Sequence, residues 1–126
     1  MSEPRAPGET AVAPECVFCA IAAGDIPSDR VHVDDLVVAF RDIAPRAPTH
    51  ILVIPRRHIA SAADLTEVDG PLLGRLFAVT AGIARREGID EGGYRLISNV
   101  GRWGGQTVAH LHLHLMGGRP LSWPPG

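Results

Sequence analysis

The chain lacks the features that would assign it to a membrane, to nucleic acid or to the secreted space. No uninterrupted apolar stretch approaches about 18 residues, which excludes a transmembrane helix. No run of basic residues exists and the net charge is −2, so neither nucleic acid nor an anionic membrane surface is an expected partner. Residues 1–8 contain no apolar signal core. A reducing cytoplasm is therefore the expected compartment.

Cysteines and the usual hydrolytic nucleophiles are also scarce. The chain has two cysteines, and no serine or cysteine nucleophile for peptide hydrolysis is evident. Its 126 residues suit one domain with a single core, and an apolar fraction of 45% is ordinary for a globular protein. Residues 1–14 are rich in Pro, Ala, Glu and Gly and have little to bury. We therefore expect a disordered leader over residues 1–14 and the folded domain over residues 15–126.

Hydrophobic periodicity predicts two helices and five strands. A short helix is expected over residues 16–23, and a long one follows the capping pattern Thr66-x-x-Asp69 and ends at Gly88. Its apolar positions fall on one face, which we expect to be buried: Leu72, Leu73, Leu76, Phe77, Thr80, Ile83 and Ala84. Strands are expected over residues 31–33, 37–41, 51–54, 94–99 and 108–116. This order indicates an α+β fold with a mostly antiparallel sheet of about five strands.

Three histidines, His110, His112 and His114, alternate with leucines near the end of the chain. Strict alternation is the period of a strand, so the leucines are predicted to enter the core while the imidazoles line the other face. A half-exposed strand that happens to carry histidines is the simpler alternative. Imidazole can donate, accept, bind a metal or attack an electrophile near neutral pH, so several rings on one face indicate a chemical site.

A glycine loop leads directly into these histidines. Gly104 and Gly105 permit close backbone approach, and their N–H groups could hold phosphate oxygens, although a plain hairpin loop is the alternative. Thr107 adds a hydroxyl group. A neutral histidine attacks phosphorus without first losing a proton, and nearby donors would neutralise the phosphoryl oxygens. The combination indicates phosphoryl or nucleotidyl transfer.

These residues resemble the histidine triad (HIT) superfamily. The run from His110 to Met116 has the form His-φ-His-φ-His-φ-φ, where φ is apolar. The likeness covers residues 15–126 and is to the nucleoside phosphoramidase branch, through segments 39–45, 49–59, 104–107 and 117–126. It implies a HIT-like fold and hydrolysis of the P–N bond of purine nucleoside 5′-phosphoramidates, such as adenosine 5′-phosphoramidate, to the nucleoside monophosphate through a nucleotidyl-histidine.

The resemblance also implies a role for each matching residue. His112 is similar to the nucleophile that attacks the α-phosphorus, and His114 to a residue that binds phosphate oxygens. His110 and His50 would orient the nucleophile, and Thr107 would stand near the departing amine. The remaining nucleotide contacts would be the ribose-binding carboxylate Asp42, the sugar and phosphate contacts Asn99, Gly105 and Gln106, and an apolar slot for the base made of Phe18, Ile21, Ile26, Phe40 and Ile43. Without the family, these apolar residues would be ordinary core.

Cys16 and Cys19 form a Cys-x-x-Cys pair, which in a cytosolic chain indicates a metal site or a redox dithiol. Zinc would need two more nitrogen or sulfur ligands, and histidines are the available candidates. Superfamily members with this pair complete a zinc site with residues that correspond to His58 and His110, and His50 is the other candidate. The resemblance implies a structural zinc that the chemistry does not require. Reduced thiols without metal and a redox pair are the alternatives.

The resemblance further implies a homodimer in which the long helix and one strand pair across a two-fold axis. Trp103, in the glycine loop, either covers the site or lies in a contact between subunits. The expected partner is a purine nucleotide. Two other functions remain open, namely a nucleotide-binding regulatory module with little turnover and a dinucleoside polyphosphate hydrolase, against which the ending over residues 117–126 argues.

Overall fold

A computed structural model describes residues 15–126, and the expected leader over residues 1–14 lies outside the described residues. Five strands form one antiparallel sheet in the order β1-β2-β3-β5-β4. The elements are α1 (Val17–Ala23), β1 (Arg30–Val33), β2 (Val37–Arg41), β3 (Thr49–Pro55), the 3₁₀ turns η1 (Ala62–Asp64) and η2 (Glu67–Asp69), α2 (Gly70–Arg86), β4 (Tyr94–Ile97) and β5 (Leu113–Gly117). The expected α+β class with one long and one short helix is confirmed.

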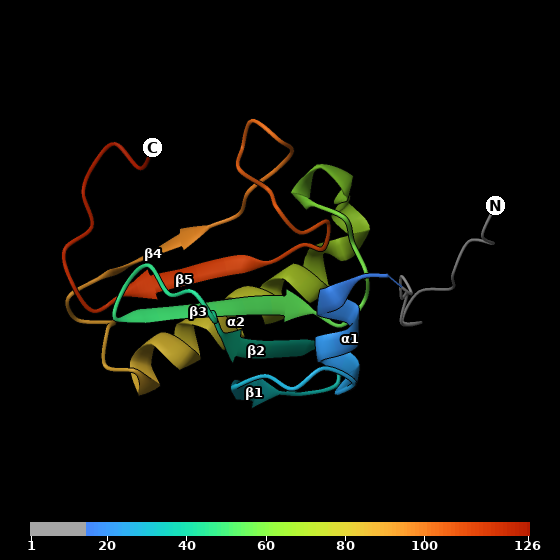
Figure 1. Ribbon diagram of the computed structural model, residues 1–126, viewed down its shortest axis with the longest axis horizontal. Coiled ribbons are helices and arrows are strands. Elements are labelled where there is room, and N and C mark those ends of the chain that lie inside the picture. The colour runs from blue at the N-terminus through green and yellow to red at the C-terminus, as the bar shows by residue number, and fades with distance from the viewer. Residues whose placement is uncertain (1–14) are drawn as a thin grey trace.

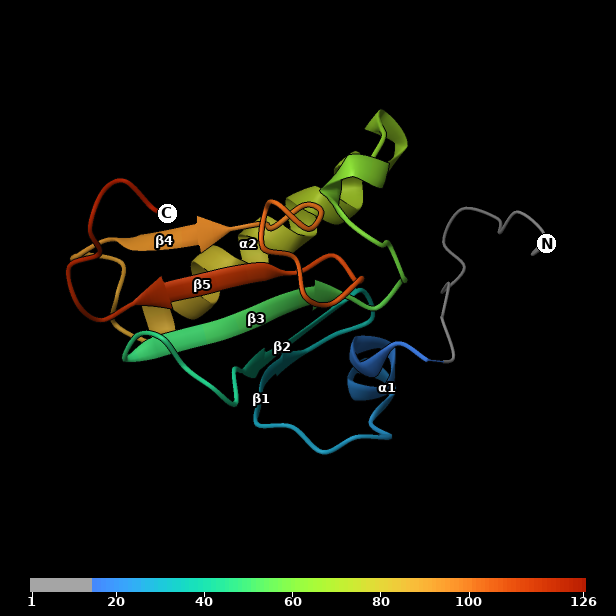
Figure 2. The same ribbon diagram turned by 45° about the horizontal axis from the view of Figure 1, so that its top comes forward.

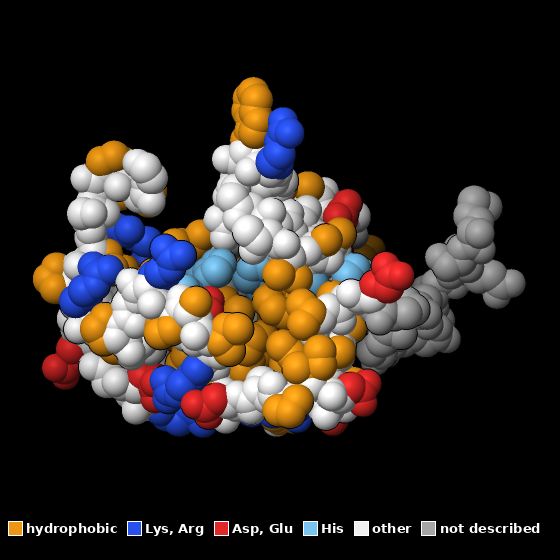
Figure 3. Space-filling model, in the orientation of Figure 1, with side chains coloured by type: hydrophobic (Ala, Val, Ile, Leu, Met, Phe, Trp, Pro, Cys, Tyr) orange, Lys and Arg blue, Asp and Glu red, His pale blue; other side chains and the backbone are white. Residues whose placement is uncertain are grey.

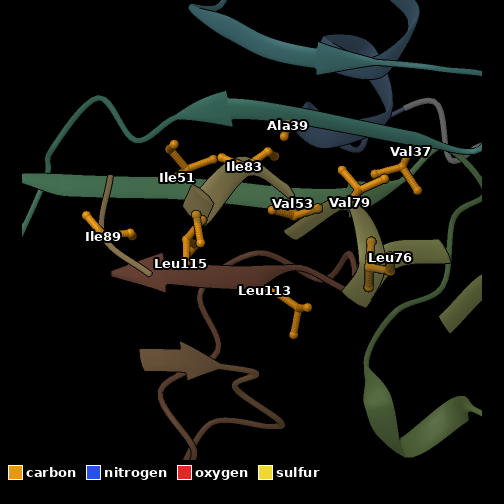
Figure 4. Packing of buried hydrophobic residues seen from close by; sticks show 11 residues of the cluster. Val37, Ala39, Ile51, Val53, Leu76, Val79, Ile83, Ile89, Leu113 and Leu115 are labelled. Carbon is orange, nitrogen blue, oxygen red and sulfur yellow. The ribbon is translucent and has the colours of Figure 1, made fainter. Parts of the chain in front are cut away.

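The two faces of the sheet carry different helices (Figures 1 and 2). Alternate residues of β2, β3 and β5 pack with α2 in one apolar cluster, part of which Figure 4 shows around Ile51, Val53 and Leu115. The intervening residues of β2 and β3 pack on the opposite face with α1, through Phe18 and Phe40. Because both faces are covered, β3 is buried along its whole length, as a strand without polar alternation requires.

The long helix starts and ends where the sequence predicts. The capping box between Thr66 and Asp69 is formed, and Gly88 follows the helix with a φ of 72°. Of the expected apolar face, Leu76, Thr80, Ile83 and Ala84 are buried, but Phe77 is 48% exposed. Val79 takes its place in the core, since the buried stripe lies slightly to one side of the predicted one.

The histidine strand is shorter than predicted. Regular pairing begins at Leu113, opposite Val53, so His110, Leu111 and His112 lie in an extended segment before β5. The neighbouring strand β4 ends at Ile97, which pairs with His114, and offers no ladder partner to the earlier residues. Instead, the Leu111 amide donates to the Ile59 carbonyl. The leucines still point inward as predicted, because extended backbone alternates its side chains with or without a ladder.

Helix α1 is fixed at both ends. At its start, the Cys16 thiol accepts a hydrogen bond from the Cys19 amide, and Gly24 ends the helix in a left-handed conformation. At its C-terminal end, Arg30 donates to the Ile21 carbonyl and Arg56 donates to the Ala22 carbonyl. Cations suit this end because the last carbonyls of a helix lack partners within the helix. Among residues 15–126, no helix combines the length and apolar character needed to cross a membrane.

Candidate active site

Five histidine rings gather on the α1 side of the sheet. The ring centroids of His112 and His114 lie 5.0 Å apart, those of His50 and His114 lie 5.2 Å apart, and those of His58 and His110 lie 5.0 Å apart. In Figure 3, histidine side chains reach the surface in a band below the raised loop between β4 and β5, bordered by an apolar patch. The structure therefore brings together all three alternating histidines and His50.

His112 has one nitrogen in use and one available. Its Nδ1 lies 2.6 Å from the carbonyl oxygen of His110. A carbonyl oxygen can only accept, so Nδ1 carries the proton and Nε2 of the neutral ring keeps its lone pair. The ring is 5% exposed and packs edge-on against Phe18, with centroids 5.1 Å apart. A buried ring held in this tautomer presents a nucleophilic nitrogen in a fixed direction.

In His114 the ring proton is on the other nitrogen, Nε2. The backbone amide of Arg46 donates to His50 Nδ1 over 3.0 Å, so the proton of neutral His50 is on Nε2. That Nε2 lies 2.9 Å from His114 Nδ1 and donates to it, which leaves the His114 proton on Nε2. The chain of hydrogen bonds therefore makes His114 Nε2 a donor, on a ring whose centroid lies 5.0 Å from that of His112. A nucleophilic nitrogen and a donor on two neighbouring rings suit attack on a phosphorus atom whose oxygens need stabilisation.

Burial keeps the rings of His50 and His114 neutral. Desolvation lowers the pKa of His114 to about 4, and repulsion from His112 and His50 adds to the shift. Desolvation also lowers the pKa of His50, against the attraction of the Asp42 carboxylate. Asp42 Oδ2 lies 3.5 Å from His50 Nε2, while Oδ1 accepts from the Ala44 amide over 2.8 Å. Asp42 thus holds its own turn and still faces the histidines with one oxygen.

The expected apolar slot is divided in two. Phe18, Ile21 and Phe40 are buried in the cluster beneath α1. By contrast, Ile43 is fully exposed and Ile26 is 38% exposed. Phe18, Ile21 and Phe40 therefore pack as ordinary core residues, which was the alternative to a base-binding slot. Only the edges of these three side chains and the exposed Ile26 and Ile43 could contact a base.

The glycine loop is held by its own hydrogen bonds. The amides of Gly104 and Gly105 donate to the carbonyls of Gly101 and Arg102, so the expectation that they are open to phosphate oxygens is wrong for this structure. The loop needs glycine for another reason, because a Cβ at position 104 would lie 2.3 Å from the Val100 oxygen. Glycine at position 104 is therefore explained by the close approach of the Val100 backbone and not by amide groups open to a ligand.

Two amide side chains brace the same loop. Asn99 Nδ2 donates to the Gly104 oxygen over 2.7 Å. The Gln106 side chain accepts from the Gly101 amide over 2.9 Å and donates to the Ala60 oxygen over 2.7 Å. These contacts position Thr107, which is exposed. Trp103 is 95% exposed at the loop, and both roles expected for it stay predictions.

A second group combines two thiols and two imidazoles. Cys16, Cys19, His58 and His110 each place one donor atom within 4.8 Å of the others. His110 Nδ1 lies 3.3 Å from Cys16 Sγ, 3.5 Å from Cys19 Sγ and 3.2 Å from His58 Nδ1. Its Nε2 donates to the Pro55 carbonyl over 2.8 Å, so the lone pair of neutral His110 is on Nδ1, toward the thiols. The other candidate ligand, His50, lies in a separate group with Asp42 and His114.

Sequence reasoning missed the backbone partners of these rings. The His110 carbonyl, the Pro55 carbonyl and the Arg46 amide decide which nitrogen of His112, His110 and His50 carries a proton. Every residue has such groups, so no side-chain pattern could have singled them out.

A family model for the HIT domain matches residues 23–121, and the chain belongs to this family. Over 111 residues it is 54% identical to the purine nucleoside phosphoramidase of Escherichia coli strain K12, a match that covers 88% of this chain and 93% of that protein. It is 52% identical over 112 residues to an uncharacterized HIT-like protein of Synechococcus elongatus, which covers 89% of this chain and 97% of that one.

Solved structures agree with this assignment. The HIT family hydrolase from Legionella pneumophila superimposes with a TM-score of 0.88 at 50% identity, covering 89% of this chain and 100% of that one. A histidine triad protein from Clostridium difficile gives a TM-score of 0.85 at 42% identity, covering 88% and 96%. The resemblance seen in the sequence is therefore confirmed.

Proposed function

We propose that this chain hydrolyses the P–N bond of purine nucleoside 5′-phosphoramidates and releases the nucleoside monophosphate. The observation that carries the proposal is the tautomer of His112, whose Nδ1 proton is committed to the His110 carbonyl while Nε2 is available. The relative from Escherichia coli, 54% identical, is named for this activity.

The reaction proceeds in two balanced steps. His112 Nε2 attacks the α-phosphorus and forms a P–N bond, while the P–N bond to the substrate amine breaks and the amine leaves with a proton taken from solvent. Thr107, an exposed hydroxyl on the braced loop, is the group we assign to the side of the departing amine. Water then attacks the same phosphorus and releases a proton to solvent, the P–N bond to His112 breaks, and the neutral ring is regenerated. Throughout, His114 Nε2 donates to a phosphoryl oxygen, which supports the charge that develops there.

Binding of the nucleoside would use the groups around this centre. Asp42 has acceptor capacity on both carboxylate oxygens, which suits two ribose hydroxyls. Ile43 and Ile26, the exposed members of the apolar slot, would cover the base against the edge of the buried cluster. Asn99, Gln106 and Gly105 would act by holding the loop that approaches the phosphate.

The test is turnover of a fluorogenic adenosine 5′-phosphoramidate by the wild type and by His112→Ala. The variant is expected to lose at least about 1,000-fold in kcat, as removal of a nucleophile does, while AMP still binds. If both proteins turned over the substrate equally slowly while binding AMP, the chain would be a nucleotide-binding module. Faster hydrolysis of diadenosine polyphosphates than of the phosphoramidate would favour the dinucleoside polyphosphate hydrolase.

We also propose that Cys16, Cys19, His58 and His110 hold a structural zinc ion. Tetrahedral bonds of about 2.0–2.3 Å place neighbouring ligand atoms about 3.3–3.8 Å apart. The observed separations of His110 Nδ1 from the other three donors, 3.2–3.5 Å, fit this geometry. Zinc would neutralise two thiolates and tie the start of α1 to the segments that follow β3 and precede β5. Metal analysis of the wild type against Cys16→Ser tests this, and equal zinc content would contradict it.

A homodimer is the assembly that we propose. Strand β4 lies at the edge of the sheet and has an open side. Phe77 on α2 is 48% exposed, and Tyr94 and Val100, at and beyond β4, are 36% and 40% exposed. Sedimentation of the wild type and of Phe77→Asp is the test, and identical masses for the two proteins would contradict this surface. A reducing cytoplasm suits the cysteines, which form no disulfide in the described residues.

A further inference from the structure

We propose that the centre formed by Cys16, Cys19, His58 and His110 positions the nucleophile, so that a bound metal ion raises kcat as well as stability. This inference rests on the proposed phosphoramidase function and assigns His58 as a positioning residue. It goes beyond a structural zinc, which would affect only how much of the protein is folded. Two physical links join the centre to His112.

The first link is His110 itself. Its ring points Nδ1 at both thiols and at His58, and its Nε2 donates to the Pro55 carbonyl. Its backbone carbonyl accepts the Nδ1 proton of His112 over 2.6 Å. The same residue therefore offers a metal ligand on its side chain and orients the nucleophile through its main chain. A displacement of the His110 ring moves the acceptor that fixes the His112 tautomer.

The second link is Phe18, which lies between the two cysteines in the chain. Its ring meets His112 edge-on at 5.1 Å and His110 at 6.0 Å. Helix α1, which carries Phe18, is held at its C-terminal end by Arg30 and Arg56. At its N-terminal end the corresponding attachment is the thiol and imidazole group. The position of Phe18 against the nucleophile therefore depends on how firmly that group is joined.

A metal ion would make this attachment firm. Without one, thiols are weak donors, and the Nδ1 atoms of His58 and His110 face each other over 3.2 Å. With one, four directional bonds replace these contacts, and two thiolates balance the charge of the ion. His110 would then be held at both ring nitrogens, by the metal and by Pro55. Reacting groups that shift by about 1 Å can lose about 100-fold in rate, so the difference between the two states is measurable.

The experiment compares the full chain loaded with zinc and after removal of zinc by a chelator, at one pH. Three quantities are measured for each form: kcat and KM for adenosine 5′-phosphoramidate, thermal stability, and the ¹⁵N signals of the His112 ring. Removal is expected to lower kcat about 10- to 100-fold with KM changed by less than about 3-fold. The ring signals should change from one tautomer to an average of two, and zinc should restore both readouts.

Variants separate positioning from folding. His58→Asn should reproduce the lower kcat at a temperature where the variant is fully folded. The matched control is His32→Asn, because His32 lies on β1 with its Nε2 bonded to Asp34, away from both centres, and this variant should leave kcat unchanged. Unchanged kcat and unchanged His112 signals on zinc removal, with only the melting temperature lowered, would overturn the inference. Failure of the wild type to retain zinc would overturn it as well.

The ring signals also separate this inference from the proposed function. If neither form hydrolyses a phosphoramidate, the proposed function fails. A metal-dependent change in the His112 tautomer would still support the coupling, and a metal-independent spectrum would overturn it. If the zinc-loaded protein is active and the zinc-free protein is equally active per folded molecule, the phosphoramidase proposal stands and the coupling fails alone.

Discussion

The two faces of the sheet use the same strands for different purposes. On the α2 face, side chains such as Leu76 and Ile83 pack in a cluster of buried apolar residues. On the α1 face, the apolar cluster borders histidines and thiols whose directions are set by backbone hydrogen bonds. The first face thus contributes to the protein through apolar burial. The candidate reacting groups lie on the second face, where a small displacement of a histidine ring is expected to have a large effect on the rate.

The largest expected effect on stability tests the α2 face. Leu76 is 1% exposed, so Leu76→Ala should lower the free energy of unfolding by about 2–5 kcal/mol through lost burial and a cavity. Its kcat per folded molecule should stay unchanged, because His112 and His114 alternate with Leu113 and Leu115 of this cluster and so lie on the other face of the sheet. Denaturant unfolding measures the first quantity. Val68→Ala, at a position 77% exposed, is the control and should change stability by less than about 0.5 kcal/mol.

The next effect concerns recognition on the α1 face. Asp42→Asn keeps the shape of the side chain but removes the charge that two ribose hydroxyls would share. It should cost about 1.5–3 kcal/mol in transition-state binding of the ribonucleotide and little for a 2′-deoxy substrate. Values of kcat/KM for both substrates measure this. If wild type and variant discriminated equally between the two sugars, Asp42 would have no role in binding ribose.

A smaller effect is expected in the pH dependence of stability, through His114 on the α1 face. The folded protein keeps His114 neutral because its pKa is lowered to about 4, whereas the unfolded chain takes up a proton near 6.5. Stability that depends on neutral His114 is therefore complete above pH 6.5 and is lost as pH falls toward 4. The loss should reach about 1–3 kcal/mol.

The control for this pH effect is His114→Asn, which cannot take up the proton. The free energy of unfolding of the wild type, minus that of the variant, should fall between pH 6.5 and pH 4 and level off below. A difference that stays constant over this range would mean that His114 titrates normally in the folded protein.

The smallest effect tests the attachment of α1. Arg56 donates to the Ala22 carbonyl over 3.0 Å and to the Asp34 carbonyl over 2.7 Å. Arg56→Gln should therefore cost about 1 kcal/mol of stability. It should leave zinc content unchanged, because the cysteines lie at the other end of the helix. Loss of zinc from this variant would show that the two ends of α1 are not independent.

Much of the fold follows from local patterns. The capping box at Thr66 and Asp69 and the glycine after α2 mark the long helix, and the uninterrupted apolar run identifies β3 as a strand covered on both faces. The order of the strands does not follow, because pairing of β3 with β5 depends on contacts between residues far apart in sequence. The late start of β5 has a related cause. Alternation of histidine and leucine reports extended backbone, and it carries no information on whether a neighbouring strand is present.

The candidate site, like the fold, could be predicted from the sequence only in part. Side-chain types indicate the alternating histidines and the cysteine pair, and the family resemblance indicates His58. The structure then places His58, and not His50, with the thiols. The partners that fix each tautomer are main-chain groups, which the sequence does not distinguish. The sequence also cannot predict that the Gly104 and Gly105 amides donate to carbonyls of their own loop. A glycine loop can direct its N–H groups either to a ligand or to its own backbone.

In the proposed mechanism, His112 attacks phosphorus through Nε2, which is unprotonated because the ring proton on Nδ1 is bonded to the His110 carbonyl. Rapid quenching of the wild type with excess adenosine 5′-phosphoramidate, followed by mass spectrometry of the peptides, tests it most directly. We expect a nucleotidyl group on His112 and none in His112→Ala. An adduct on another residue, or steady turnover with no adduct at any quench time, would contradict it.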